Sequence, residues 1–452
     1  MSLAVLQDSK PYQVAAAIVQ KLNAHGHVAY FAGGCIRDAL RGFPPKDIDI
    51  ATSATPAQVQ ALYHRTIPVG VQFGVVRVLL DEMEFEVATF RSDGVYLDGR
   101  RPEEVQFSTP EQDALRRDFT INGMFYDPLG DRMIDYVNGR EDLARKVIRA
   151  IGRASERFAE DRLRMLRAIR FASTLAFEIE SGTWSALREE AHAIAIVSPE
   201  RIRDELLKIL VNPHRLRGFD LLDKSGLLGV ILPEVAALKG CEQPERFHPE
   251  GDVFVHTRLM LGLLTPNASE AQVLAVLLHD IGKPPTRSFD SVDQRIRFNG
   301  HDRIGAEMAE AAMIRLRFPR QEIDLVVEAV RNHMVFKDVQ QMRPAKLRRF
   351  MARPHFGIEL ELHRIDCAGS HGDLENYQFL VRKSSEFAQE PLIPPPLVRG
   401  DDLISMGLKP GPKIGELLEA VQTAQLEGEI NTRAEALQLL HKLLEKLGEL
   451  SG

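Results

Sequence analysis

The pattern of hydrophobic residues changes near Leu143, and this change limits the folds that the chain can adopt. Before it, β-rich runs such as VAYFAGG, DIDIAT, VVRVLL and FEVATF alternate with helical segments such as TPAQVQALYH. After it, long segments such as ERFAEDRLRMLRAIRFAS and AQVLAVLLHDIGK have helical spacing. We therefore predict an α+β fold: an N-terminal head with a small mixed β-sheet and helices, then an all-α neck, a helical body and a helical tail.

The length of the chain requires several domains, because 452 residues exceed the ~150 residues of a typical domain several-fold. Prolines mark one linker: Pro391 and the triple proline 394–396 disfavour a helix and favour an extended chain. The predicted boundaries are 1–150 for the head, 151–225 for the neck, 226–390 for the body and 391–452 for the tail.

The net charge of −7 gives the whole chain no general attraction for nucleic acid. One stretch differs: Gly139 to Arg170 contains ten Lys or Arg against five Asp or Glu, which would suit phosphates. The three cysteines form no CxxC pair, and no apolar run approaches the ~20 residues of a membrane span. We expect a cytoplasmic protein without a leader peptide or a membrane partner.

The segment GGCIRDALRGFPPKDIDIAT places two carboxylates one residue apart in a strand-like run. Because strand side chains alternate, Asp47 and Asp49 should share one face while the isoleucines point into the core. Read alone, this is most often a solvent-facing strand edge. Two Mg²⁺ ions about 3.5–4 Å apart would neutralise the pair and organise a phosphoryl displacement. The glycines and an arginine nearby would receive a phosphate, and a neighbouring strand would bring a third carboxylate: the candidates are Gly33, Gly34, Arg37 and Glu86.

This head resembles the class II tRNA nucleotidyltransferases and bacterial poly(A) polymerases of the polymerase β-like superfamily. After GGCIRDALRG and KDIDIAT, further matches follow in order over residues ~1 to 215: FEVATFRSDGVYLDGRRP, LRRDFTINGMFYD, NGREDLARKVIRAIG, AEDRLRMLRAIRFA and SPERIRDEL. The resemblance implies transfer of a nucleotide to RNA with release of pyrophosphate, with Asp47, Asp49 and Glu86 as catalytic residues.

Four residues of AEDRLRMLRAIRFA recur at three- and four-residue steps, on one side of a predicted helix: Glu160, Asp161, Arg164 and Arg167. By themselves they would form ordinary surface ion pairs. An aspartate beside an arginine also offers an acceptor and a donor that match the Watson–Crick edges of cytosine and adenine, but not those of uracil and guanine. The resemblance gives Asp161 and Arg164 the role of a protein template for CTP and ATP, with Glu160 orienting the arginine.

The resemblance assigns contacts with the ribose and the phosphates of the nucleotide to Arg116, Arg117, Asp118 and Asn122. The alternative is that Asp118 only caps a turn and that the two arginines are solvated. The segment RSDGVYLDGRRP, with Gly94 and Gly99 as hinges, resembles the loop that helps the family change from CTP to ATP. Its presence favours terminal A addition over CC addition alone.

Histidines of the helical body resemble the pattern of HD-domain phosphohydrolases: the main set is His256, His279, Asp280 and Asp366, with His301 and His333 as further candidates. A lone histidine is more often a core residue than a ligand. The doublet His279–Asp280 ends an apolar helix, where a buried carboxylate is costly unless a cation or a donor meets it. We expect a divalent metal there, such as Mg²⁺, Mn²⁺ or Ni²⁺, and the resemblance implies hydrolysis of 2′,3′-cyclic phosphates and phosphomonoesters; the alternative is a purely structural metal site.

Three functions remain open from the sequence. The first is addition or repair of the 3′ CCA end of tRNA from CTP and ATP, and the second is a poly(A) polymerase or an enzyme that adds only A. The third is HD phosphohydrolysis with a head that only grips RNA. The predicted partners are tRNA, CTP and ATP, with RNA contacts at Arg145, Lys146 and Arg149; the oligomeric state, monomer or dimer, stays open.

Overall fold

The computed structural model describes residues 9–70, 73–93, 105–244, 248–387 and 391–446. The chain divides into two compact units. The first comprises Met1–Ala236 with 265–267 and 315–318, and the second comprises Ala237–Leu264, Ala268–Ile314 and Pro319–Gly452. The predicted boundary at 225/226 lies near the division between the units, while the boundaries at 150 and 390 lie inside them and stay predictions.

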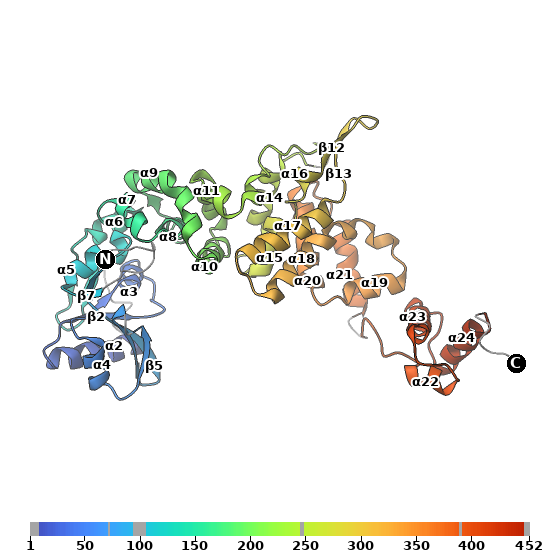
Figure 1. Cartoon of the computed structure of the whole chain (residues 1–452), viewed down its shortest axis with the longest axis horizontal. Helices are drawn as coiled ribbons and strands as arrows, with labels where there is room; N and C mark the ends of the chain where they lie inside the picture. Colours follow the sequence, from blue (N-terminus) through green and yellow to red (C-terminus); the bar gives the residue numbers. More distant parts are fainter. Residues whose placement is uncertain (1–8, 71–72, 94–104, 245–247, 388–390, 447–452) are drawn as a thin grey trace. The chain divides into compact units, whose positions relative to one another are not determined.

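A seven-stranded mixed sheet forms the centre of the head, in the order β3-β4-β5-β2-β1-β8-β9 (Figure 1). Its strands are β1 Ala29–Ala32, β2 Asp49–Thr52, β3 Thr66–Gly70, β4 Val75–Leu80, β5 Met83–Thr89, β8 Phe125–Asp127 and β9 Arg132–Ile134. A separate two-stranded ribbon joins β6 Arg91–Asp93 to β7 Val105–Phe107. The predicted α+β head with a small mixed sheet is confirmed.

The register of the sheet determines which side chains meet beside the glycine turn. Strand β2 is antiparallel to β1, with Ala32 opposite Asp49, and parallel to β5, with Ile50 opposite Val87. The first pair places the residue after β1, Gly33, next to Asp49. The second pair places Glu86 on the strand beside Asp49, as expected for a carboxylate on a neighbouring strand.

Helices complete the first unit. They are α2 Lys10–Ala24, α3 Gly34–Leu40, α4 Pro56–Leu62, α5 Pro110–Leu115, η2 Thr120–Asn122, α6 Gly139–Arg145, α7 Ala154–Glu160, α8 Arg164–Leu175, α9 Ser181–Glu190, η3 Ala191–Ile196, α10 Pro199–Leu210, α11 Arg215–Lys224, α12 Leu227–Ile231 and α13 Pro233–Ala236. In α4, Thr55 and Gln58 form a capping box, which the sequence TPAQ favours.

The second unit is mainly helical. Its elements are α14 Val253–Leu263, α15 Glu270–Leu278, α16 Lys283–Thr286, β12 Arg287–Asp290, β13 Arg295–Phe298, α17 His301–Arg315, α18 Arg320–Asn332, η4 His333–Gln341, α19 Pro344–Met351, α20 Phe356–Gly369, α21 Glu375–Phe387, α22 Gly400–Ser405, α23 Pro412–Glu427 and α24 Arg433–Lys446. The last three helices bury their own apolar cluster, which includes Leu403, Leu417 and Leu440. No helix among the described residues is long and apolar enough to cross a membrane.

The structure corrects the all-α prediction for the neck and the body at two places. A parallel pair joins β10, Val147–Ile148, to β11, Glu178–Ile179. Strands β12 and β13 form an antiparallel hairpin, drawn in yellow in Figure 1. Asp290 stabilises the hairpin turn, because its Oδ1 accepts the backbone N–H groups of Val292 and Asp293 at 2.9 and 3.2 Å. That local bond makes a turn more favourable than a helix.

Candidate active site and metal centre

A cavity of about 620 Å³ in the first unit gathers most of the predicted nucleotide-binding residues. Carboxylates, glycines and arginines that line it are Gly33, Gly34, Arg37, Asp49, Glu86, Arg91, Arg116, Arg117, Asp118, Asp161, Arg164, Arg167, Arg170 and Arg201, together with Asn122 and Phe171. The segment before residue 150 provides the glycine turn, Asp49, Glu86 and half of the arginines, and the segment after it provides Asp161 and the other arginines. The volume and the positive wall suit a ligand with several phosphates.

Two of the three predicted catalytic carboxylates, Asp49 and Glu86, line the cavity. Asp47 and Asp49 are exposed while Ile48 and Ile50 are buried, so the predicted alternation holds. Asp47 is not part of the cavity lining, but its charge acts on Asp49. Although Asp49 is accessible to solvent at the cavity wall, desolvation by the surrounding protein and the charge of Glu86, opposed by Arg117 and helped by Asp47, raise the pKa of Asp49 to about 6. Carboxylates that repel in this way fit divalent cations, which would stabilise their charged forms.

The glycine turn brings the backbone close to an arginine of the cavity. Gly33 has a φ of +74°, a region in which side chains are unfavourable, and a Cβ there would lie 3.0 Å from Nη1 of Arg117. Arg37, one turn into α3, donates from Nη1 to Oδ1 of Asn122 at 2.7 Å. The turn therefore leaves room for the arginine side of the cavity.

Buried aspartates hold the arginines in place. Asp113 is 1% exposed and forms ion pairs with Arg116 at 2.7 Å and with Arg117 at 3.0 Å. Asp118 accepts two hydrogen bonds from Arg167, at 2.5 and 2.8 Å, and one from Nδ2 of Asn122 at 3.1 Å. Although burial opposes ionisation, Arg167 and Asn122 lower the pKa of Asp118 to about 2. Asp118 thus anchors an arginine of the cavity wall through two bonds.

The predicted helix through Glu160 and Arg167 is interrupted, which corrects the sequence interpretation. Helix α7 ends at Glu160, and α8 begins at Arg164. Oδ1 of Asp161 accepts the backbone N–H of Leu163 at 3.0 Å, and such side-chain bonds compete with helical ones. The predicted pair of Glu160 and Arg164 is present, with Nη1 2.6 Å from Oε2.

The two residues predicted to read the base, Asp161 and Arg164, have partners that the sequence interpretation missed. Oδ2 of Asp161 accepts from Nη2 of Arg201 on α10 at 2.7 Å. Arg164 is 8% exposed and also donates from Nη2 to the carbonyl of Arg116 at 2.9 Å. Arg170 stacks on Phe171, with 4.3 Å between the guanidinium carbon and the ring centre. The motif SPERIRDEL contains Arg201 and was the one signal that could have identified it.

The residues predicted to contact RNA differ in their surroundings. Arg145 and Lys146 are exposed, and Arg145 pairs with Glu141 at 2.8 Å. Arg149 is held at 3.0 Å by buried Asp142, so it has a structural partner. The predicted hinges Gly94 and Gly99 lie outside the described residues.

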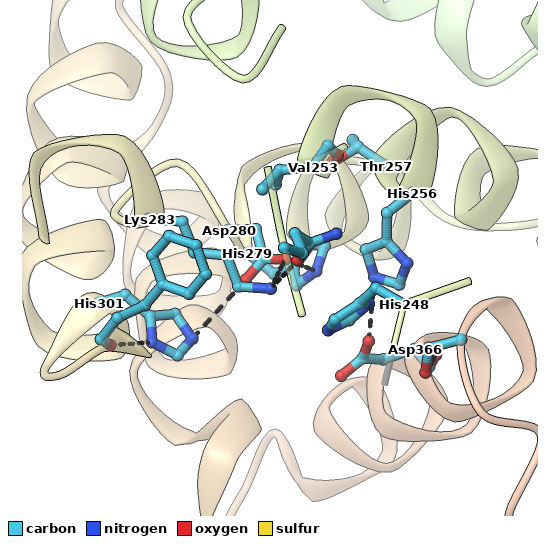
Figure 2. Close-up of polar contacts among 12 residues, drawn as sticks. His248, Val253, His256, Thr257, His279, Asp280, Lys283, His301 and Asp366 are labelled. Atoms are coloured by element: carbon cyan, nitrogen blue, oxygen red, sulfur yellow. Dashed lines mark hydrogen bonds and ion pairs between the residues drawn. The ribbon is translucent and has the colours of Figure 1, made fainter. Parts of the chain in front are cut away.

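In the second unit, five helices and the turns beside them bring the predicted histidines and aspartates together (Figure 2). The cluster consists of His256 on α14, His279 and Asp280 after α15, His301 at the start of α17, His333 after α18, and Asp366 on α20. All except Asp366 are at least 90% buried. Ligand atoms of His256, His279 and Asp280, and those of Asp280, His301 and His333, lie within 4.8 Å of one another.

Three imidazoles of this cluster have a defined orientation. Nδ1 of His279, His301 and His333 lies 2.8, 2.7 and 2.6 Å from the backbone carbonyl three residues earlier. Because Nδ1–H donates to these carbonyls, Nε2 carries the lone pair in each neutral ring. Three such nitrogens and carboxylates form a donor set that suits a divalent transition metal.

The bonding of the buried polar atoms in this cluster indicates whether a metal ion would fit between them. Among the described residues, Nε2 of His279 is buried without an aligned hydrogen bond, 3.0 Å from Oδ2 of Asp280. That oxygen pairs with Nζ of Lys283 at 2.7 Å. Burial opposes ionisation of Asp280, yet His279 and Lys283 hold its pKa well below the usual range. A charged carboxylate beside an unpaired imidazole nitrogen fits a cation. Sequence reasoning missed three neighbours of the cluster: His248, Glu250 and Lys283.

Comparison with known proteins identifies the family of this chain. Family models match in four places: the poly A polymerase head domain at 29–149, the probable RNA and SrmB-binding site of polymerase A at 176–239, the HD domain at 253–355, and a putative domain 2 of tRNA nucleotidyltransferase at 394–440. The CC-adding tRNA nucleotidyltransferase of Thermus thermophilus is 32% identical over 424 residues, covering 91% of this chain and 93% of the relative. This chain belongs to the tRNA nucleotidyltransferase family.

The tRNA nucleotidyltransferase relatives differ in the nucleotides that their names give. The A-adding tRNA nucleotidyltransferase of Deinococcus radiodurans is 31% identical and covers 92% of this chain and 96% of the relative. The Bacillus stearothermophilus CCA-adding enzyme in complex with CTP shares the fold, with a TM-score of 0.73, 28% identity, and coverage of 98% of this chain and 100% of that chain. These relatives share one family but differ in whether their names give CC, A or CCA as the nucleotides added.

Proposed function

We propose that this nucleotidyltransferase adds CCA to the 3′ end of tRNA, using CTP and ATP and releasing pyrophosphate. The observation that carries the proposal is the composition of one cavity: Asp49 and Glu86 line it together with Asp161 and Arg164. A cavity that combined cation-binding carboxylates with a donor and an acceptor for one base edge would serve both catalysis and selection.

Catalysis in this proposal uses Asp47, Asp49 and Glu86 as ligands for two Mg²⁺ ions. The ions, when bound, would activate the terminal ribose hydroxyl of the RNA and neutralise the triphosphate. Asp49 contributes the charged form that the ions require. Arg117 and Arg167, held by Asp113 and Asp118, position the phosphates and add positive charge.

Base selection depends on two anchored side chains. Asp161 would accept from the exocyclic amino group of cytosine or adenine, and Arg164 would donate to the adjacent ring nitrogen. Glu160 and the carbonyl of Arg116 fix Arg164, and Arg201 fixes Asp161. Fixed groups lose little freedom when the base binds, which favours discrimination.

The experiment is a primer extension on a defined tRNA that lacks CCA, with Mg²⁺ and with CTP and ATP together or singly. Addition of three nucleotides supports the proposal. A stop after CC, addition of A only to a tRNA ending in CC, or a long adenylate ladder would assign one of the alternatives instead. Asp47→Ala combined with Asp49→Ala should abolish extension while circular dichroism stays unchanged.

A second candidate function concerns the second unit: metal-dependent hydrolysis of phosphate esters. It is favoured by the buried imidazole nitrogens and the carboxylate of Asp280 that converge in the cluster. A divalent metal there would lower the pKa of bound water and provide a nucleophile. His279→Ala should abolish hydrolysis of 2′,3′-cyclic nucleotides and phosphomonoesters and leave tRNA extension unchanged. Equal hydrolysis by the variant would exclude this site as its source.

A further inference from the structure

A second group of metal-type donors lies beside the HD cluster, in the turn that precedes α14 and on the first turn of α14. It consists of His248, Glu250 and His256. Asp252 fixes this turn, because its carboxylate accepts the backbone N–H of Val255 at 2.9 Å and that of Gly240 at 2.6 Å. The HD pattern in the sequence includes only one of the three donors.

The three donors converge on a small space. Oε1 of Glu250 forms a hydrogen bond with Nδ1 of His248 at 2.9 Å and lies 2.7 Å from Nδ1 of His256. The two imidazole rings meet edge to face, with 5.0 Å between their centres. The exposed fractions of the side chains are 17% for His248, 8% for Glu250 and 0% for His256. This space is therefore largely shielded from water.

Two atoms of this group are buried without a hydrogen-bond partner among the described residues: Oε2 of Glu250 and Nδ1 of His256. The short contact between Glu250 and His256 thus lacks the alignment of a hydrogen bond. The other nitrogen of His256, Nε2, is 3.1 Å from Oδ1 of Asp366 (Figure 2). If Nε2–H donates to Asp366, Nδ1 carries a lone pair and lies 2.7 Å from Oε1 of Glu250.

A lone pair beside a buried carboxylate is unfavourable unless a positive charge lies between them. A proton on Nδ1 would neutralise only the contact between His256 and Glu250. A divalent cation would be bound by all three donors at once, including His248. Two imidazole nitrogens and one carboxylate are the donors of transition metals such as Zn²⁺ or Mn²⁺, whereas Mg²⁺ prefers oxygen ligands.

We propose that His248, Glu250 and His256 bind a second divalent transition-metal ion, distinct from the ion expected at His279 and Asp280. The rings of His256 and His279 are 5.5 Å apart, so the two ions would be neighbours. Paired ions can stabilise both the attacking and the leaving oxygen of a phosphate ester. The proposal extends the metal binding proposed for the HD cluster, but its test counts ions rather than turnover.

The test uses the full-length chain, stripped of metal with EDTA and titrated with Zn²⁺. Bound ions per chain are measured by elemental analysis, and affinities by calorimetry. The wild type should bind two ions, Glu250→Gln should lose one with at least a tenfold weaker affinity, and His279→Ala should lose the other. Glu242→Gln, an exposed glutamate of the same loop, is the matched control and should keep both.

Three results would overturn the second site: one ion in the wild type, two ions in Glu250→Gln, or one shared ion lost in both variants. The last result would mean that Glu250 acts on the HD ion through His256. Binding of no ion by the wild type would refute the metal expected at His279 and Asp280 as well. Extension of tRNA and circular dichroism, unchanged in Glu250→Gln, show that the variant is folded.

Discussion

At the scale of single residues, the cavity is organised by acids that hold arginines. Asp118 fixes Arg167, and Asp113 fixes Arg116 and Arg117. The opposite arrangement occurs at Arg201, where an arginine holds Asp161, the acid proposed to read the base. Charge-assisted bonds of this kind are directional, so they orient the groups as well as neutralise them. Loss of one partner should therefore change ligand recognition and not only stability.

Replacement of Arg201 by alanine should release Asp161 and weaken base selection. We expect kcat/KM for CTP and ATP to fall about tenfold or more, because a hydrogen bond to a charged group contributes roughly 1.5–3 kcal/mol. Misincorporation of UTP and GTP should rise relative to CTP and ATP. Single-nucleotide extension measures both. Arg203→Ala on the same helix, where Arg203 pairs with Asp204, is the control, and an equal effect of both variants would contradict the prediction.

Asp118 predicts a pH dependence of stability for the first unit. Its pKa is lowered from 3.8 to about 2, so its contribution is complete above pH 4 and disappears as the pH falls through 2. At pH 7, Asp118→Asn should reduce the free energy of unfolding by on the order of 2 kcal/mol, and the difference should shrink below pH 4. Fluorescence of Trp184, the single tryptophan, follows unfolding of this unit. A difference that does not vary with pH would refute this origin.

At the scale of elements, two turns with glycine at positive φ have different surroundings. Gly33, after β1, approaches Arg117, whereas Gly26, after α2, has φ +81° and no neighbour within 4 Å of a Cβ position. The two glycines therefore separate the cost of backbone strain from the cost of close approach.

Gly33→Ala should raise KM for both nucleotides severalfold, because the new methyl group displaces Arg117 from the cavity. Gly26→Ala should lose a comparable ~1 kcal/mol of stability from strain and keep its KM. Steady-state kinetics and thermal unfolding measure the two effects. Similar kinetics in both variants would mean that the approach to Arg117 has no role.

Elements with a strong local pattern could be predicted from the sequence. Alternation in DIDIAT correctly gave the exposure of Asp47 and Asp49 and the burial of the isoleucines, although β2 begins only at Asp49. The break after Glu160 could not be predicted, because the bond between Asp161 and Leu163 competes locally with a helical pattern that continues on both sides. Partners from distant segments, such as Arg201 for Asp161, depend on tertiary packing that no local pattern contains.

At the scale of the whole molecule, a net charge of −7 means that tRNA must bind through local positive surface. We propose Arg145 and Lys146 as part of such a surface. The side chain of Lys146 is exposed at the end of α6, so its replacement should leave the fold intact.

Lys146→Glu should therefore raise KM for tRNA severalfold, leave KM for CTP unchanged, and reduce the dependence of tRNA affinity on salt. Filter binding at several salt concentrations measures the slope. Lys10→Glu carries the same charge change at an exposed site at the start of α2 and is the control. An unchanged slope in Lys146→Glu would remove this residue from the RNA contacts.

The orientation of the three HD imidazoles has a practical consequence. Because a backbone carbonyl holds Nδ1 of His279, His301 and His333, each ring should exist as one tautomer rather than as a mixture. Nitrogen-15 spectra of selectively labelled histidine would then give a separate resonance for every coordinating Nε2. The order in which these resonances shift during a titration with a divalent metal ion would show which of the three histidines binds the metal first.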